Sequence, residues 1–265
     1  MAVALNKISV IGAGVMGEAL ISALIKSGQN PAQIEIIEKR ADRVAELSSK
    51  YGIKGGQSLA DSNIVLIVVK PQDLESLLAE INGKISDETL VISFVAGKRI
   101  DTILKGLGGK NPVVRVMPNT PTLVGKGAAG YSFGSGLSEA QKIFVIDLLN
   151  ASGIAVEVIE ELQDAVTATS GSGPAYIFAF VESMINGAKA LGLSEEVATK
   201  LTVQTLIGAA ELLQSSGKSP AMLRENVTSP NGTTFAALQS LSASELDKIV
   251  AKAMKAARDR SIELN

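Results

Sequence analysis

Runs of consecutive apolar residues, many of them β-branched, recur through the first 160 residues of the chain and then stop. The clearest is Ile64–Val69, in which every residue is apolar. A strand buried on both faces has this pattern, whereas a strand with one face in water alternates apolar and polar residues. Because amphipathic helical patterns lie between the runs, the sequence predicts a mainly parallel sheet that helices cover on both faces.

The predicted elements alternate along this first part. We expect strands near Lys7–Ile11, Ile34–Glu38, Ile64–Val69, Leu90–Val95, Val113–Met117, Ala128–Phe133 and Ile154–Ile159. We expect helices near Met16–Ser27, Ala41–Tyr51, Gln72–Ile81 and Glu139–Asn150. Ser138 precedes the last of these helices and Gln141 follows three residues later, which is the pattern of a capping box.

Beyond Glu160 the strand signals end and only helical patterns remain. The long ones lie near Ala175–Leu191, Glu195–Ser216 and Glu245–Ile262. Ser194 is the predicted N-cap of the second, and Ser242 with Glu245 is predicted to begin the third. We therefore predict two domains, a Rossmann-type α/β domain over residues 1–160 and an all-α domain over residues 161–265.

The last helix has an apolar stripe that requires a covering surface. The stripe consists of Leu246, Ile249, Val250, Ala253 and Ala257. A helical module of about 100 residues is small to be stable alone. We therefore expect a homodimer or a larger homo-oligomer, joined through the helical domain.

Composition excludes several classes of function. The 25 basic side chains nearly balance the 27 acidic ones, so we expect neither a nucleic-acid partner nor a charged membrane surface. The chain has no Cys and no His, which excludes thiol chemistry, a Ser-His-Asp relay and a Cys/His metal site, and we predict no metal. Met1–Val10 lacks the features of a targeting segment, so a cytoplasmic location is expected.

The strongest motif is a G-x-G-x-x-G that follows the first predicted strand directly and opens a helix, as a dinucleotide-binding turn requires. Its candidate cofactor-binding residues are Gly12, Gly14, Val15, Met16 and Gly17. Gly12 would permit the tight turn, Gly14 the close approach of backbone to pyrophosphate, and Gly17 the contact between helix and strand. The alternative is a glycine turn with a structural role alone.

Glu38 ends the second predicted strand at the usual distance for an acid that binds the ribose 2′-hydroxyl of NAD. Lys39 and Arg40 follow it, with Arg43 one turn later, and such cations can pair with the 2′-phosphate of NADP. The alternative for both cations is a solvated loop charge. We predict use of NADPH or NADH with a modest preference for NADPH.

Further candidate cofactor contacts lie in the loops at the carboxyl ends of other predicted strands, where such sheets bind ligands. They are Val69, Lys70, Pro71, Ala96, Gly97, Met117, Pro118 and Asn119. Pro71 at a helix start and Pro118 at a strand end also have a purely structural interpretation.

Two turns in the helical half have an unusual density of Gly, Pro, Ser and Thr. The segment 169–176 and the segment 228–235 each lead into a predicted helix. Such a turn presents backbone N–H groups and hydroxyls together, which suits the binding of a carboxylate without a cationic side chain. The alternative is that both are ordinary helix caps.

Five segments together resemble pyrroline-5-carboxylate reductases, in order and in spacing over nearly the whole chain. They are the glycine-rich segment 12–17 and the segments 68–71, 115–121, 170–176 and 228–234. The resemblance implies reduction of the C=N bond of 1-pyrroline-5-carboxylate by NAD(P)H, the last step of proline synthesis, in homodimers or larger assemblies.

The resemblance also implies roles for the second turn. Thr234 would hydrogen-bond the substrate ring nitrogen as the catalytic residue, and Asn231, Gly232 and Thr233 would complete the substrate site with backbone amides. Two residues depart from the family pattern: Asn231 replaces a usual glycine, and Glu38 is unusually acidic for an NADPH user.

The chemistry is compatible with a chain that lacks histidine. A ketone needs a proton donor during reduction, whereas a cyclic imine can be protonated beforehand and accept hydride as an iminium ion. The alternatives are a β-hydroxyacid dehydrogenase, a related imine reductase or a non-catalytic dinucleotide-sensing dimer. The hydroxyacid enzymes have a lysine a few residues after their second glycine motif, whereas here Pro174–Phe178 follows Gly173 and contains none.

Overall fold

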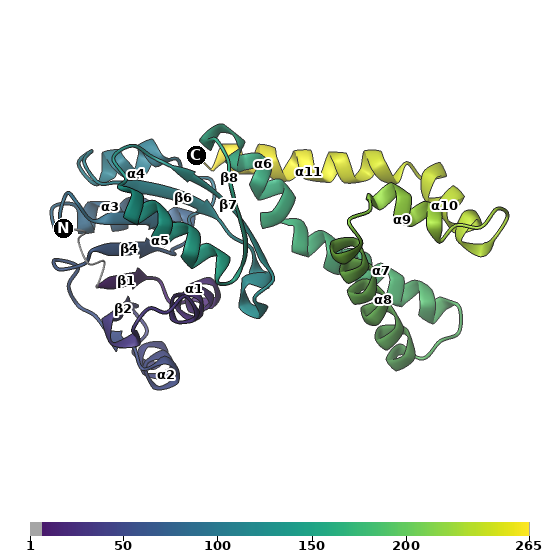
Figure 1. Ribbon diagram of the computed structural model, residues 1–265, viewed down its shortest axis with the longest axis horizontal. Coiled ribbons are helices and arrows are strands. Elements are labelled where there is room, and N and C mark those ends of the chain that lie inside the picture. Colours follow the sequence, from purple (N-terminus) through teal and green to yellow (C-terminus); the bar gives the residue numbers. More distant parts are fainter. Residues whose placement is uncertain (1–6, 265) are drawn as a thin grey trace. The chain divides into compact units, whose positions relative to one another are not determined.

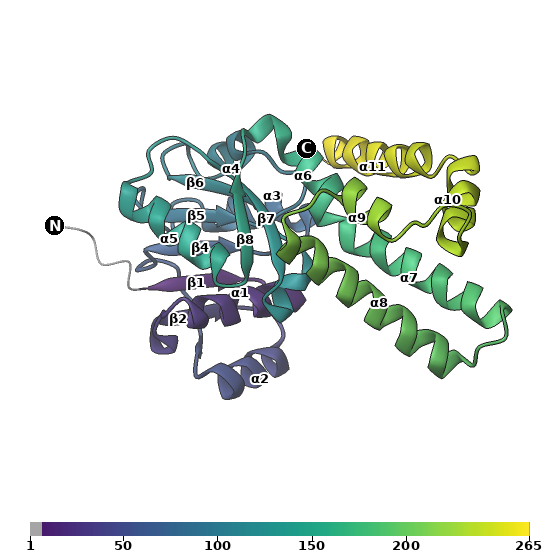
Figure 2. The ribbon, with the colours of Figure 1, turned by 45° about the vertical axis from the view of Figure 1, so that its right-hand side comes forward.

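The computed structural model describes residues 7–264, which form two compact units. The first comprises the chain up to Ser172 together with the segment from Ala257 onward. The second is Gly173–Ala256. Figures 1 and 2 show a sheet with flanking helices in the first unit and helices in the second.

Within the described residues, the first unit contains an eight-stranded sheet of order β3-β2-β1-β4-β5-β6-β7-β8. The strands are β1 (Ile8–Ile11), β2 (Ile34–Ile37), β3 (Lys54–Gly55), β4 (Ile64–Ile67), β5 (Leu90–Ser93), β6 (Val113–Met117), β7 (Gly127–Phe133) and β8 (Gly153–Glu157). Neighbouring strands are parallel except for β6 and β7, which are antiparallel. The link between these two is too short for the crossover that a parallel pair requires.

Helices cover both faces of the sheet. They are α1 (Val15–Lys26), α2 (Ala41–Tyr51), α3 (Leu74–Ile81), α4 (Ile100–Gly106), α5 (Glu139–Asn150) and α6 (Gln163–Val166), the last continuing into a π-helical turn at Thr167–Gly171. One hydrophobic core joins the sheet to α1, α2 and α5, and another joins it to α3 and α4. Ile64 and Leu66 of β4 lie in the first core and Val65 and Ile67 in the second, which explains the continuous apolar run.

The second unit consists of helices joined by short turns (Figure 1). They are α7 (Gly173–Ala190), α8 (Glu195–Ser216), α9 (Pro220–Asn226), α10 (Thr233–Ala243) and α11 (Leu246–Glu263), of which α11 continues into the first unit. α7 and α8 pack on each other. Ser194 caps α8 as predicted, because its hydroxyl accepts from the Val197 N–H at 3.3 Å.

The predicted fold class, a mainly parallel Rossmann-type sheet followed by an all-α part, is confirmed. The capping box of Ser138 and Gln141 at α5 is also confirmed. The predicted last helix is present as α11, but the predicted cap of Ser242 with Glu245 is wrong, because Ser242 lies inside α10 and Glu245 has a φ of 54°. This left-handed residue ends the helical path, and α11 begins only after it.

Candidate active site

The glycine-rich turn lies at the carboxyl end of β1, between the ends of β2 and β4. The Gly12 N–H donates to the Ile37 carbonyl at 3.0 Å, and the Val68 N–H donates to the Ile11 carbonyl at 2.8 Å. The chain crosses from β1 to β2 on one side and later to β4 on the other, so the strand order reverses here. Open α/β sheets bind ligands at this reversal.

The three glycines of the turn have different surroundings. A Cβ on Gly12, whose φ is +92°, would lie 2.5 Å from the Val68 carbonyl oxygen, and one on Gly17 would lie 2.1 Å from the Gly12 carbonyl oxygen. A Cβ on Gly14 would meet no described atom within 4 Å. Gly12 and Gly17 are therefore required for packing, whereas open space lies in front of Gly14, next to the exposed Val15 and the half-buried Met16.

Glu38 is bound to its own protein backbone. One carboxylate oxygen accepts the Ala13 N–H at 3.0 Å, and the other accepts the Arg40 N–H at 3.1 Å and the Arg40 Nε–H at 3.2 Å. Burial opposes ionisation, but hydrogen bonds from the Arg40 side chain and from the Ala13 and Arg40 backbones lower the pKa of Glu38 below its ordinary value. The carboxylate thus links the glycine-rich turn to the end of β2.

The two cations that follow Glu38 are exposed. Lys39 is exposed, and the side chain of Arg40 is 57% exposed although it pairs with Glu38. An exposed ion pair of this kind contributes little to stability, so Arg40 can exchange its partner at low cost.

The loops after β4 and β5 differ in their access to solvent. After β4, Val69 is half-buried and Lys70 exposed, while Pro71 begins the 3₁₀ turn Pro71–Asp73. After β5, Ala96 is half-buried and Gly97 is buried with a φ of +71°. A Cβ on Gly97 would lie 2.6 Å from the Leu264 Cβ, so the carboxyl end of α11 packs on this glycine.

The loop after β6 is held by its own asparagine. The Asn119 side chain donates from Nδ2 to the Ser170 carbonyl at 3.1 Å and accepts the Ala128 N–H at Oδ1, at 2.9 Å. A Cβ on Gly171 would lie 2.5 Å from the Met117 Cε, and Pro118 is buried. The buried Asn119 amide therefore joins this loop to β7 and to the π-helical turn.

In the second unit, the predicted substrate loop is a turn at the amino end of α10. Asn231 has a φ of 59°, a left-handed conformation that asparagine tolerates better than most residues. Gly232 is the N-cap, and a Cβ there would lie 2.5 Å from the Ser229 Oγ. Thr233 and Thr234 are exposed, and no described side chain caps the helix. The first-turn N–H groups are thus open to a ligand.

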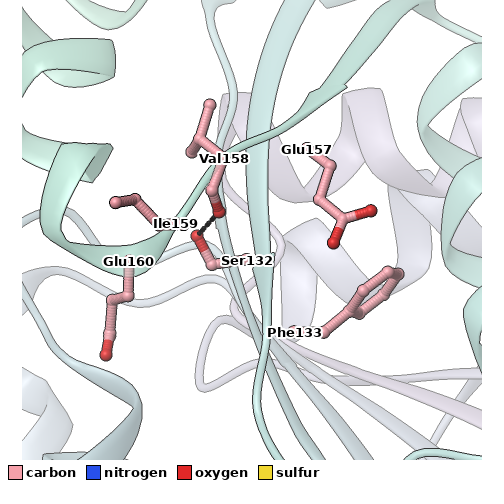
Figure 3. A pocket seen from close by; sticks show the side chains of 6 residues that line it. All are labelled: Ser132, Phe133, Glu157, Val158, Ile159 and Glu160. Atoms are coloured by element: carbon pink, nitrogen blue, oxygen red, sulfur yellow. Dashed lines mark hydrogen bonds between the residues drawn. The ribbon is translucent and has the colours of Figure 1, made fainter.

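A hollow of about 400 Å³ lies at the β7–β8 edge of the sheet. Within it the Ser132 hydroxyl donates to the Val158 carbonyl at 2.7 Å (Figure 3). It is lined by Ser132, Phe133, Glu157, Val158, Ile159 and Glu160. None of these is a predicted site residue, and the hollow holds no evident catalytic arrangement.

Two kinds of feature are absent from the described residues. Residues 7–264 contain no group of three or more His, Cys, Asp or Glu side chains placed to hold a metal ion. No helix within that range is long and apolar enough to cross a membrane. The cytoplasmic location stays a prediction.

Known proteins resemble the chain along its full length. The family described as "Pyrroline-5-carboxylate reductase dimerisation" matches residues 160–264, and "NADP oxidoreductase coenzyme F420-dependent" matches residues 7–97. The pyrroline-5-carboxylate reductase of Pseudomonas aeruginosa is 41% identical over 97% of this chain and 96% of its own length. That of Arabidopsis thaliana is 34% identical over 98% of this chain and 95% of its own length.

The chain belongs to the pyrroline-5-carboxylate reductase family.

Solved structures of this family agree with that membership. A pyrroline-5-carboxylate reductase from Coxiella burnetii superposes with a TM-score of 0.91 at 34% identity, covering 98% of this chain and 99% of its own. The Plasmodium falciparum pyrroline carboxylate reductase with NADP bound superposes with a TM-score of 0.87 at 30% identity, covering 98% of each chain. The resemblance inferred from the five sequence segments is therefore confirmed, and the chain is an oxidoreductase of the pyrroline-5-carboxylate reductase family.

The sequence predicted Arg43 only as a further cation near Glu38. In the structure the Arg43 Nε–H donates to the Ala13 carbonyl at 2.9 Å, so this side chain touches the glycine-rich turn. The two residues lie 30 positions apart, and no local pattern indicates such a contact. The only signal was a basic residue one turn into the helix after β2.

Proposed function

We propose that this chain reduces the C=N bond of 1-pyrroline-5-carboxylate with NAD(P)H and so forms L-proline. The observation that carries the proposal is the family relationship along the whole chain, at 41% identity to the Pseudomonas aeruginosa reductase. In this proposal residues 1–160 bind the cofactor, and residues 161–265 bind the substrate and join the subunits.

The glycine-rich turn fits a dinucleotide. The space in front of Gly14 is open, and the amino end of α1 offers backbone N–H groups, the usual partners of a pyrophosphate. A bound NAD(P)H would supply hydride to the imine carbon. The loops at Val69, Ala96 and Met117 lie at the carboxyl ends of neighbouring strands and complete the proposed cofactor edge.

The surroundings of Glu38 favour use of both cofactors with a modest preference for NADPH. Its carboxylate already accepts the Ala13 N–H and Arg40, so the ribose must compete for it. Lys39 and Arg40 are exposed and can pair with a 2′-phosphate.

The turn before α10 is the proposed substrate site. The amide groups around Gly232 and Thr233 would bind the substrate carboxylate, since the amino end of a helix attracts an anion. The Thr234 hydroxyl would hydrogen-bond the ring nitrogen. Asn231 has a left-handed backbone, a conformation open also to the glycine that is usual at this position in the family.

The chain needs no histidine for this reaction. The imine of the substrate takes its proton from solvent before or during binding, and the resulting iminium accepts hydride without an acid of the protein. The role of the protein is to align the two reactants and exclude water. Thr234 then orients the nitrogen and is not the obligatory proton source.

We further propose that two copies associate through their helical parts. Apolar side chains are widely exposed on the second unit, including Phe178 of α7 at 64% and Ile249 of α11 at 56%. Monomeric proteins rarely expose large apolar patches. A second copy of the same chain would cover it symmetrically.

The proposal is tested by following NADPH oxidation with 1-pyrroline-5-carboxylate, compared with NADP⁺ reduction by 3-hydroxyisobutyrate. We expect turnover with the first substrate and none with the second. Turnover of the hydroxyacid alone would indicate a β-hydroxyacid dehydrogenase. Cofactor binding without turnover of either would indicate a dinucleotide sensor.

A further inference from the structure

The backbone of Ala13, in the middle of the glycine-rich turn, is held on both sides. Its N–H donates to the Glu38 carboxylate at 3.0 Å, and its carbonyl accepts the Arg43 Nε–H at 2.9 Å. Ala13 itself is fully buried. Two side chains from the segment after β2 therefore fix both peptide groups that flank this residue.

Arg43 is itself held rigidly by carboxylates. Its guanidinium pairs with Glu18 of α1 and, at 2.7 Å, with Glu46 of α2, so each of its three nitrogens donates to a protein oxygen. Its side chain is only 14% exposed. A guanidinium with this set of partners is not free to follow a mobile ligand.

Glu18 is the centre of this network. Hydrogen bonds from Lys50 first, and then from Arg43 and Tyr51, lower the pKa of Glu18 to about 2. The Lys50 ammonium lies 2.7 Å from one carboxylate oxygen and the Tyr51 hydroxyl 3.1 Å from the same oxygen. The carboxylate therefore stays charged near neutral pH and keeps Arg43 in place.

We propose that Arg43 is a positioning residue for the phosphate-binding turn, which rests on the proposed function. In a trans peptide the carbonyl of one residue and the N–H of the next point in opposite directions. Because Arg43 holds the Ala13 carbonyl, it also fixes the direction of the Gly14 N–H, beside the open space at that glycine. The turn is thereby preorganised to bind a pyrophosphate, and binding loses less conformational freedom.

The nearby Arg40 has a different role. Its side chain is 57% exposed and pairs with Glu38, whereas Arg43 donates to three oxygens of the protein. Arg40 can therefore meet the 2′-phosphate that distinguishes NADPH from NADH. Arg43 acts through the turn that would bind the pyrophosphate, which both cofactors contain.

The test measures dissociation constants of three ligands for the purified full-length protein: NADPH, NADH, and adenosine 2′-monophosphate, which lacks the pyrophosphate. We expect Arg43→Met to raise the constants for NADPH and NADH by the same factor, roughly 5- to 20-fold, the effect of one hydrogen bond with a charged donor. The constant for adenosine 2′-monophosphate should not change. Arg40→Ala, the matched control, should weaken NADPH and adenosine 2′-monophosphate but not NADH.

A second variant, Arg43→Lys, separates positioning from simple charge. Lysine keeps the positive charge beside Glu18 and Glu46 but lacks the planar fork that reaches the Ala13 carbonyl at the same time. We expect the same loss for both cofactors, and this variant also serves if Arg43→Met fails to fold. Full affinity in Arg43→Lys, or a loss confined to NADPH in either variant, would overturn the inference. If the unaltered protein bound neither cofactor, the proposed function would fail and the inference with it.

Discussion

The two units of the chain differ in how far they bury their apolar side chains. In the first unit the central strands β1, β4 and β5 are buried along their whole length, and helices cover both faces of the sheet there. In the second unit, Gly173–Ala256, all of which the structure describes, only Ala198 and Thr202 are buried. The α/β unit buries its core within one chain, whereas the helical unit leaves apolar residues exposed that we propose a second copy covers.

The contrast between the two units predicts the largest effect for a charge placed in the exposed apolar stripe of α11. Ile249→Asp should raise the dissociation constant of the homodimer by about 1000-fold, because each copy would bury an unpaired carboxylate in the interface. The first unit should still bind NADPH. Sedimentation at several concentrations measures the effect.

Lys248→Gln is the matched control, since helical spacing places Lys248 away from the apolar stripe, where it pairs with the exposed Glu245. It should leave association unchanged. If Ile249→Asp associates as tightly as the unaltered chain, the stripe of α11 is not at the interface.

A change in the α10 turn should separate catalysis from cofactor binding. Thr234→Ala should lower turnover of 1-pyrroline-5-carboxylate by roughly 10- to 1000-fold, between the effect of one lost hydrogen bond and that of a general acid. Affinity for NADPH should hardly change, because the proposed phosphate site lies in the first unit. Steady-state kinetics and a fluorescence titration measure the two quantities.

Ser242→Ala, at the other end of the same helix, is the control and should retain turnover. Full turnover in Thr234→Ala, or an equal loss of cofactor affinity, would mean that the turn is only a helix cap.

Within the first unit, two glycines should respond in opposite ways. Gly14→Val should raise the dissociation constant of NADPH by roughly 10- to 100-fold with little change in stability, because the added side chain occupies the open space where pyrophosphate would approach. Gly17→Val should destabilise the fold, since its Cβ would meet the Gly12 carbonyl oxygen at 2.1 Å. Cofactor titration and thermal unfolding separate the two. Unchanged NADPH binding in Gly14→Val would show that the phosphates do not bind at this turn.

The smallest expected effect is the pH dependence of the Glu18 network. The pKa of Glu18 in the folded state is about 2, below its ordinary value, so its contribution to stability is present above about pH 4.5 and is lost as the pH falls toward 2. Glu18→Gln should lower the midpoint of thermal unfolding by about 2–4 °C at pH 7. The difference should shrink at pH 3, and a difference that did not depend on pH would contradict the charged network.

Sequence patterns predicted the fold well where the physical signal is local. The continuous apolar runs, the capping box at Ser138 and the N-cap at Ser194 each depend on neighbouring residues, and all correspond to elements of the structure. The two-residue β3 and the short helix α4 were missed, because segments this short are too short to show a repeating apolar pattern. The cap predicted at Ser242 was wrong because α10 runs through this residue, which the local pattern does not indicate.

The candidate active site was likewise predictable only where the signal is local in the sequence. Gly12, Gly14 and Gly17 were predictable because the turn requires glycine at fixed spacing. The clamp of Arg43 on Ala13 was not, because it depends on how two helices and a strand end come together. The packing of Leu264 on Gly97 likewise joins residues that are far apart in the sequence.

The central contrast lies between an α/β unit that buries its own core and a helical unit that we propose a second copy covers. The mass of the purified protein in solution tests it most directly. Sedimentation equilibrium at micromolar concentration should give twice the chain mass of 27.4 kDa, or a larger even multiple. A particle of 27.4 kDa that retained full reductase activity would contradict the account, because the apolar helices would then be stable in water without a second copy.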